Sequence, residues 1–550
     1  MQRKLLILGF VTFLAGLASC SSCEGGKTNL LALIPADVPG AVVLPNLAKT
    51  VGDIKALKDK FSVGPMALVL TSSHNELKAM LGFDPLQVEA LKKLGLAPEK
   101  GLAMVPAPEE EAFIVLGISD RKVFEAEIKK RLKEAFAADQ IQTSKHEGLS
   151  FTSVGSQIDK AFSARLHYAF SGKFALLAGP NADLKKLARL SKLKTEESLL
   201  GAGWYKSLTA KSPVDADVLV VVNGKKAEAL QAQAGLLTQH MDEGMALAVG
   251  LAPNGLSLDL FVGLDKASAS RLAGFAEGVK DEHLERYLPA DSVAAIKLRL
   301  NIGKVLDQAL GLDAGFKAEY DKSLAEAKRA LKTDVEASTV RNLTGNFIMG
   351  LSLGKPDTIN QLLHSIIAQQ PPTKEAGEAM RIFAWAQVQD AAAWLQILDN
   401  VLGIATESQS LKVTKKSVGG LQAILLSTPD MPTEVFLMNK GDLIGVCAGN
   451  GCLEQSASLI SGKGKKLPDQ MSAGARKLFD EPSSLVSYLN FTQMREVVQG
   501  LDTNAFGDAG YMAKMAFGMA MTILQNIKEL SGVVRLEGGG LRLAGHLEIQ

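Results

Sequence analysis

Aromatic side chains and net charge are both scarce in this sequence. Phe, Trp and Tyr make up 5% of the 550 residues, and 60 Lys plus Arg balance 59 Asp plus Glu, which leaves a formal charge of +1. Surfaces that bind sugars or single strands usually expose aromatic rings, and nucleic acids or anionic membrane surfaces attract clustered positive charge. The composition therefore predicts that nucleic acid is not a partner, and it disfavours carbohydrate binding.

The sequence also lacks the motifs of common catalytic and metal sites. It contains no G-x-S-x-G, no H-E-x-x-H, no Walker loop, no EF-hand loop and no G-x-G-x-x-G after an expected strand. The seven histidines are scattered, without the i, i+3 or i, i+4 pairs of a metal-binding helix. His283, within "DEHLER" (281–286), is expected on a solvated inter-domain helix. These absences predict a non-enzymatic protein without cofactor or metal; an enzyme with an unrecognised site is the weaker alternative.

The N-terminus contains a short, uncharged apolar run. Arg3 and Lys4 precede "LLILGFVTFLAGL" (5–17), which has the length of a signal sequence and is too short to span a bilayer comfortably. "LASC" follows and ends at Cys20, a pattern that resembles a bacterial lipobox. We predict a lipoprotein signal peptide over 1–19 and attachment of acyl chains such as palmitate to Cys20. An ordinary signal peptide with a chance cysteine, or an uncleaved anchor, is the alternative.

A lipid anchor predicts where the rest of the chain lies. Residues 20–30 are mostly small and polar and are expected to form a flexible tether. The residue after the modified cysteine is Ser21 and not Asp, which by similarity to enterobacterial lipoproteins favours the outer over the inner membrane. The most apolar later stretch, 505–524, contains Asp508 and Lys514 and does not suit a second anchor. We therefore expect soluble domains outside the cytoplasm, in the periplasm or at the cell surface, held to a membrane by lipid.

Two further cysteines form a close pair. Cys447 and Cys452 lie in "CAGNGC", at an expected strand end and turn, whereas Cys23 is left in the tether. An oxidising compartment favours a local disulfide between Cys447 and Cys452. Two buried free thiols or half of a metal site are the alternatives, although no second Cys or His pair supplies the other ligands of a metal.

The chain contains an internal repeat. "AFIVLGISD" (112–120) aligns without a gap to "IFAWAQVQD" (382–390), at an offset of 390 − 120 = 270. "AGPN" from Ala178 and "AGNG" from Ala448 keep this offset, since 448 − 178 = 270. A chain of this length is expected to form more than one domain. An ordered series of matches predicts two tandem copies of one unit.

The repeat sets the expected domain boundaries. Pro-Ala-Asp opens both copies, at 35–37 and at 289–291. We predict a first domain over 31–270, an inter-domain helix or linker over 271–285, and a second domain over 286–550.

A proline, an apolar strand and an asparagine recur four times, and the spacing from Pro to Asn differs each time. Catalytic side chains must converge to within about an angstrom, so a drifting spacing argues against an active site. Pro keeps the chain extended, and Asn accepts a hydrogen bond from a free N–H at a helix start. The pairs are Pro35/Asn46, Pro213/Asn223, Pro289/Asn301 and Pro482/Asn490. We interpret the motif as a turn, a strand and a helix cap.

Each copy alternates half-buried strands with amphipathic helices. Asp120 and Asp390 end strands and are placed as helix N-caps. After Asp390 the apolar positions begin with Trp394 and Leu398. After Asp120 an apolar stripe recurs at four-residue spacing, formed by Phe124, Ile128, Leu132 and Phe136. The pattern predicts an α+β fold: two tandem copies of a unit whose antiparallel or mixed sheet is covered on one face by amphipathic helices.

Three segments carry a resemblance to a known family. "ALIPAD", "ESLLGAGWYKSLTAKSPVDADVLVVVN" (197–223) and "NLTGNFIMGL" (342–351) resemble a domain-of-unknown-function family of large, duplicated bacterial envelope lipoproteins. The resemblance covers most of the mature chain and implies the duplicated architecture. It implies no activity, because none is generally assigned to the family.

These features together predict a lipid-anchored, non-enzymatic envelope protein that serves as a binding or scaffold module for an unknown envelope protein. The alternative is a carrier of an apolar ligand or lipid in a groove between sheet and helices. Met512, Met515 and Met519 share one helix face and are the candidates for such a groove. Plain core packing and thioether binding of Cu(I) are other interpretations of these methionines.

Overall fold

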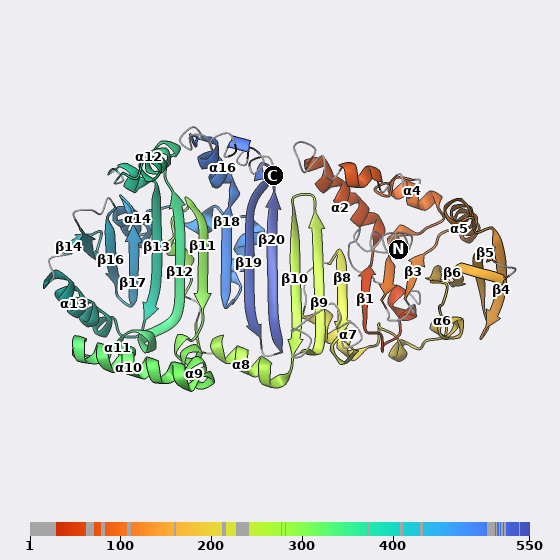
Figure 1. Cartoon of the computed structure of the whole chain (residues 1–550), viewed down its shortest axis with the longest axis horizontal. Helices are drawn as coiled ribbons and strands as arrows, with labels where there is room; N and C mark the ends of the chain where they lie inside the picture. The colour runs from red at the N-terminus through yellow and green to blue at the C-terminus, as the bar shows by residue number, and fades with distance from the viewer. Residues whose placement is uncertain are drawn as a thin grey trace. The chain divides into compact units, whose positions relative to one another are not determined.

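The computed structural model describes residues 29–550 except 62–70, 77, 79–82, 107–111, 159–160, 212–215, 227–240, 277, 281, 371–372, 374, 408–410, 429–432, 503–511, 513, 516–517, 519–520, 522–523 and 538. The chain divides into two compact units. Unit 1 comprises residues 1–269 and 539–543, and unit 2 comprises residues 270–538 and 544–550. Figure 1 shows the elements of both units as an α+β fold.

Unit 1 contains an antiparallel sheet with the strand order β10–β9–β8–β1–β2–β3–β7–β6–β5–β4. The first strand of the chain lies near the middle of this sheet, between β8 and β2, because those two strands pair with its two edges. The strands are β1 (Gly40–Leu44), β2 (Leu102–Val105), β3 (Phe113–Gly117), β4 (Gln140–His146), β5 (Leu149–Ile158), β6 (Ala161–Ser171), β7 (Phe174–Ala178), β8 (Val218–Asn223), β9 (Met241–Ala252) and β10 (Gly255–Leu264).

Both faces of the unit 1 sheet are covered by apolar cores. Successive strand residues point to opposite faces, so Val43 joins the core on one side and Leu44 the core on the other. The first core takes in the 3-10 turn η1 (Leu30–Leu33) and helices α6 (Leu184–Leu190) and α7 (Gly203–Ala210). The second core is built with α2 (Leu47–Lys60), α4 (Val88–Lys93) and α5 (Arg121–Phe136).

Unit 2 contains an antiparallel sheet with the same order of corresponding strands. Its order is β19–β18–β11–β12–β13–β17–β16–β15–β14, and β20 pairs with β19. The strands are β11 (Ser292–Arg299), β12 (Leu343–Leu353), β13 (Met380–Val388), β14 (Lys412–Val418), β15 (Leu421–Ser427), β16 (Val435–Lys440), β17 (Leu443–Ala448), β18 (Leu485–Asn490), β19 (Ile527–Glu537) and β20 (Gly540–Ile549).

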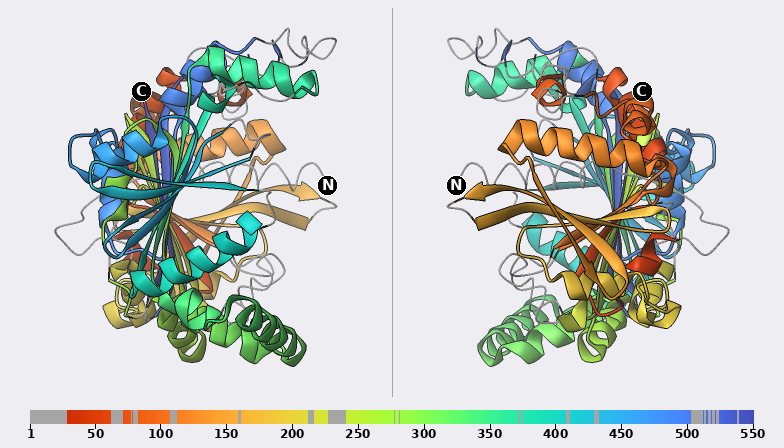
Figure 2. Two further views of the ribbon diagram at one scale, coloured as in Figure 1. Left: turned by 90° about the vertical axis from the view of Figure 1, so that its left-hand side faces the viewer. Right: turned by 90° about the vertical axis from the view of Figure 1, so that its right-hand side faces the viewer.

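One face of the unit 2 sheet packs on an apolar core. This core contains Phe383 and Trp385 of β13, Phe436 of β16, and residues of η7 (Leu284–Tyr287), α14 (Cys452–Ile460) and α15 (Ala473–Asp480). The other helices of unit 2 are α9 (Ile302–Leu312), α10 (Ala314–Leu331), α11 (Val335–Ser338), α12 (Pro356–Ile367), α13 (Ala391–Glu407) and α16 (Phe491–Gln499). Figure 2 shows α12 and α10 near opposite ends of the strands, extending to the same side of this sheet.

The expected caps are present. The Asn46 side chain accepts hydrogen bonds from the backbone N–H groups of Ala48 and Lys49 at the start of α2. Asn301 and Asn490 do the same for α9 and α16. Asn223 accepts a bond from the backbone of Lys225, and Asp120 and Asp390 cap α5 and α13. The recurring proline–strand–asparagine motif is therefore structural at the described positions; Pro213 lies outside them.

The structure refines the expectations for the covering of the sheet, for its strand directions and for the segment 271–285. The sheet of unit 1 is covered on both faces and not on one, because Phe124, Ile128 and Leu132 of α5 pack on a second core. The strand pairs with a described register are all antiparallel, so the mixed alternative is not seen among them. No single helix spans the described residues of 271–285: α8 (Lys266–Ala276) ends first, and the 3-10 turn η7 begins at Leu284 and includes the buried Glu285. In the described part of the chain, no helix is long and apolar enough to cross a membrane.

Candidate functional site: an open apolar sheet face

The structure places some of the predicted site residues as expected and others not. Cys447 and Cys452 form a disulfide, as predicted, from the end of β17 to the start of α14, and both are buried in the core of unit 2. Cys20 and Met519 lie outside the described residues. Met512 and Met515 are helical and exposed. The described residues do not place these methionines in a groove.

Unit 2 presents two fully apolar rows on the sheet face opposite its core. The rows follow from the strand register, because directly opposed residues of neighbouring strands point to the same face. The central row is Ile296, Met349, Ala384, Val446, Leu437 and Ile424. The flanking row is Ala294, Leu351, Ile382, Ala448, Val435 and Leu426. We call these twelve residues the open face.

The side chains of the open face remain accessible. Ile296 is 39% exposed, Met349 40%, Val446 39% and Ile382 40%, and the other eight residues are partly buried. None of the twelve is buried, and none belongs to the core of unit 2 or packs against it. A contiguous exposed apolar patch on a folded protein usually marks a site of interaction.

The equivalent face of unit 1 is covered by its own helices. Val42, Met104 and Ile114 correspond in register to Ile296, Met349 and Ala384 and are partly buried. Val42 and Ile114 pack against the second core, and their neighbour Leu44 is fully buried. Apolar residues of α2, α4 and α5 complete the core over this face. The two faces thus have the same strand order and a different covering.

The helices that follow the open-face strands also expose apolar side chains. They are Leu312 and Phe316 at the junction of α9 and α10, Ile366 and Ile367 in α12, and Val401 and Ile404 in α13. No residue of α9 or α10 is buried, although both helices are amphipathic. Among the described residues, three exposed large apolar side chains lie in unit 1 and fourteen in unit 2. The accessible apolar surface is therefore concentrated in unit 2.

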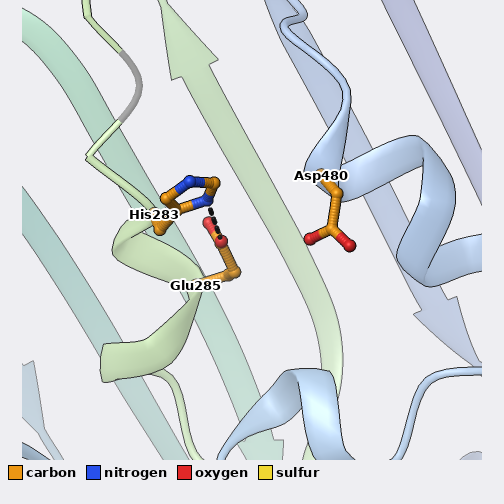
Figure 3. Close-up of side chains that lie close together, drawn as sticks. All are labelled: His283, Glu285 and Asp480. Carbon is orange, nitrogen blue, oxygen red and sulfur yellow. Dashed lines mark hydrogen bonds and ion pairs between the residues drawn. The ribbon is translucent and has the colours of Figure 1, made fainter.

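A buried ion pair lies on the core side of the unit 2 sheet. The Lys297 ammonium, from β11, donates to Glu285 Oε2 at 2.9 Å, and the two side chains are 3% and 5% exposed. Glu285 Oε1 lies 3.1 Å from Nδ1 of His283. Figure 3 shows the Asp480 carboxylate of α15 on the side toward His283 and Glu285.

His283, Glu285 and Asp480 are the residues that could hold a cation in the described part of the chain. Their ligand atoms lie within 4.8 Å of one another. Imidazole and carboxylate groups are ligands for divalent transition metals. Lys297 already engages one oxygen of Glu285, so the arrangement works as a charge network without any ion. Sequence spacing did not reveal this cluster, because Asp480 comes from a distant segment.

A polar cavity of about 270 Å³ lies where α9 begins, and its lining includes Lys304, Asp307 and Arg341. Arg341 donates two hydrogen bonds to Asp307, at 3.0 and 2.7 Å, and one to Glu336 at 2.9 Å. These bonds raise the pKa of Arg341, and the bond from Arg341 holds the pKa of Asp307 below its usual value. The guanidinium is therefore neutralised within the protein, which makes the cavity a poor site for an anion.

No family model, curated protein or solved structure matches this chain. The geometry of the described residues therefore carries the functional assignment. The open face was missed from the sequence. The middle of β13, from Ile382 to Ala386, is apolar on both faces, a pattern that normally signals covering on both sides.

Proposed function

We propose that the protein is a lipid-anchored, non-enzymatic envelope protein that binds its partner through the open face of unit 2. The observation that supports this proposal is the difference between the two units. In unit 1 this face packs against an apolar core that includes residues of α2, α4 and α5, whereas in unit 2 two apolar rows lie outside the core and remain accessible. Leaving such a surface in water is unfavourable, by roughly 25 cal/mol for each Å² of apolar area, and a bound partner would remove that cost.

The same proposal includes the location of the protein, at a membrane of the cell envelope. The run over 5–17 and the "LASC" sequence before Cys20 support a lipoprotein anchor, more in keeping with the outer than the inner membrane. The Cys447–Cys452 disulfide supports an oxidising compartment, although weakly, because a single local disulfide is a small sample. Unmodified Cys20 in the mature protein, measured by intact mass, would remove this part of the proposal.

The units are proposed to be copies of one ancestral domain. Support comes from the sequence offsets and from the strand order, since β1, β2, β3 and β7 are arranged as β11, β12, β13 and β17 are. In this interpretation unit 1 keeps the closed form of the domain, and unit 2 has gained a binding surface. The proposed domains are 31–270 and 286–550.

Site-specific photo-crosslinking in intact cells tests the binding surface. A photoreactive amino acid replaces Met349 in the central row or, as the matched control, Ile141, an exposed apolar residue of β4. We expect an adduct from position 349 that disappears when Val446→Glu is added, and no such adduct from position 141. Equal adducts from both positions, or none from 349, would remove the open face as the binding surface.

A further inference from the structure

We infer that the occupant of the open face is the acyl chain of a lipid. This inference rests on the proposed function and adds the class of ligand. The central and flanking rows contain Ile, Leu, Val, Met and Ala and no polar or charged side chain across six strands. These two rows offer only apolar contact, which is the interaction that a hydrocarbon chain can make, and polar side chains appear in the next row of the same face, as Asn439 and Gln422.

The residue composition of the open face favours an acyl chain over a protein as the bound partner. Centres of protein interfaces are enriched in Tyr, Trp and Arg, which anchor the partner through pockets and hydrogen bonds. The twelve open-face residues include none of these three types. Met349, Ile296 and Val446 instead give a pliable aliphatic surface, and Met in particular adapts to irregular apolar ligands.

The dimensions also fit a hydrocarbon chain. Neighbouring strands lie about 4.8 Å apart, so a row across six strands is roughly 24 Å long. One leaflet of a bilayer holds acyl chains in about 15 Å, half of the usual hydrocarbon thickness. The central row is bounded by polar residues: Ser487 opposes Ile296 at one end, and Lys415 opposes Ile424 at the other. An acyl chain therefore fits within the row and leaves its polar group at a polar edge.

Photolabelling of the full mature protein in lipid nanodiscs tests this inference. One arm contains a trace of phosphatidylethanolamine with a diazirine-bearing acyl chain, and the other contains a diazirine analogue of palmitate. Labelled residues are mapped by mass spectrometry. The two arms distinguish phospholipid from free fatty acid, and the protein's own acyl chains carry no photoreactive group.

We expect labelling on the peptides that contain Ile296, Met349 and Val446 in at least one arm, competed by excess unlabelled lipid. Val446→Glu places a charge on the face and should reduce the labelling at least about tenfold. Ile141→Glu, at an exposed apolar position of unit 1, should leave it unchanged. The thermal unfolding midpoints of both variants show that the fold is retained.

Absence of label from the open-face strands, or label that a folded Val446→Glu variant retains, would overturn the inference. The two proposals can fail separately. A protein adduct from position 349 without acyl labelling would refute the lipid and leave the binding surface intact. Absence of both would refute the binding surface as well.

Discussion

The two units place strands of the same order in different surroundings. In unit 1, Leu44 at the end of β1 is fully buried beneath α2, α4 and α5. The equivalent position in unit 2, since 44 + 254 = 298, is Leu298 of β11, which stays half exposed and outside the core. The same strand order therefore supports either a closed domain or one with an accessible apolar face. The covering helices, and not the sheet, decide between them.

The cores opposite these faces differ as well. Glu285 and Lys297 form a buried ion pair in unit 2, where unit 1 has Leu31 and Val43 at the equivalent positions, 254 residues earlier. Unit 2 also buries Tyr488, whose hydroxyl donates to Glu529 Oε2 at 3.1 Å. Burial, and then the charge of Glu529, raise the pKa of Tyr488. Unit 2 thus combines charged groups inside its core with apolar groups at its surface.

The largest effect is expected from breaking the buried pair. Lys297→Met should lower the free energy of unfolding by about 3–5 kcal/mol, because it leaves the Glu285 carboxylate buried without its counter-ion. Urea unfolding measures the loss, and hydrogen exchange of β11 and β18 amides assigns it to unit 2. The double variant Glu285→Leu/Lys297→Val copies the residues of unit 1. It should be close to the wild type or more stable; a double variant as unstable as the single one would contradict this account.

Replacing one leucine by alanine on each face compares how much packing contributes to stability on the covered and the open face. Leu44→Ala should lower the free energy of unfolding by about 2–5 kcal/mol, since it opens a cavity in a closed core. Leu298→Ala should cost less than about 1.5 kcal/mol, because that side chain is partly exposed and lies outside the core. Urea unfolding of both variants makes the comparison. Equal losses would mean that Leu298 is packed as tightly as Leu44.

A smaller, pH-dependent difference is expected at Asp217, which is buried in unit 1 where unit 2 has Ser484. Burial raises the pKa of Asp217, despite hydrogen bonds from the Leu251 backbone and Lys49. A carboxyl group with a raised folded-state pKa favours the folded state at low pH, and this contribution disappears as the pH rises through that pKa. The wild type should therefore gain stability relative to Asp217→Asn as the pH falls from 7 to 4. Urea unfolding across this range measures the difference, and a change of opposite sign would contradict the assignment.

Local features could be predicted from the sequence, and long-range packing could not. The Asn46 and Asp120 caps and the Cys447–Cys452 disulfide each depend on a few neighbouring residues, and all three are present. The position of β1 between β2 and β8 depends on pairing with residues far along the chain, since Val42 opposes Met104 (104 − 42 = 62) and Val220 (220 − 42 = 178), and periodicity does not encode such pairing.

The open face could not be predicted for a related reason. Periodicity indicates that Met349 and Ile348 lie on opposite faces of β12, and both are apolar. It does not indicate whether α9 and α10 pack on the Met349 side. Glu285 was expected in a solvated helix because its neighbours are charged. It is buried instead, because it forms an ion pair with Lys297 of β11, which is distant in sequence.

Strand β14 bears on how a protein with an accessible apolar sheet face avoids associating with other copies of itself. It pairs with β15, and a second strand partner is absent among the described residues. An unpaired edge next to an apolar face can recruit strands from other copies and so begin a fibre. β14 carries Lys412, Lys415 and Lys416, all exposed, and like charges on two such edges would repel each other. These lysines would discourage polymerisation while leaving the neighbouring apolar rows accessible.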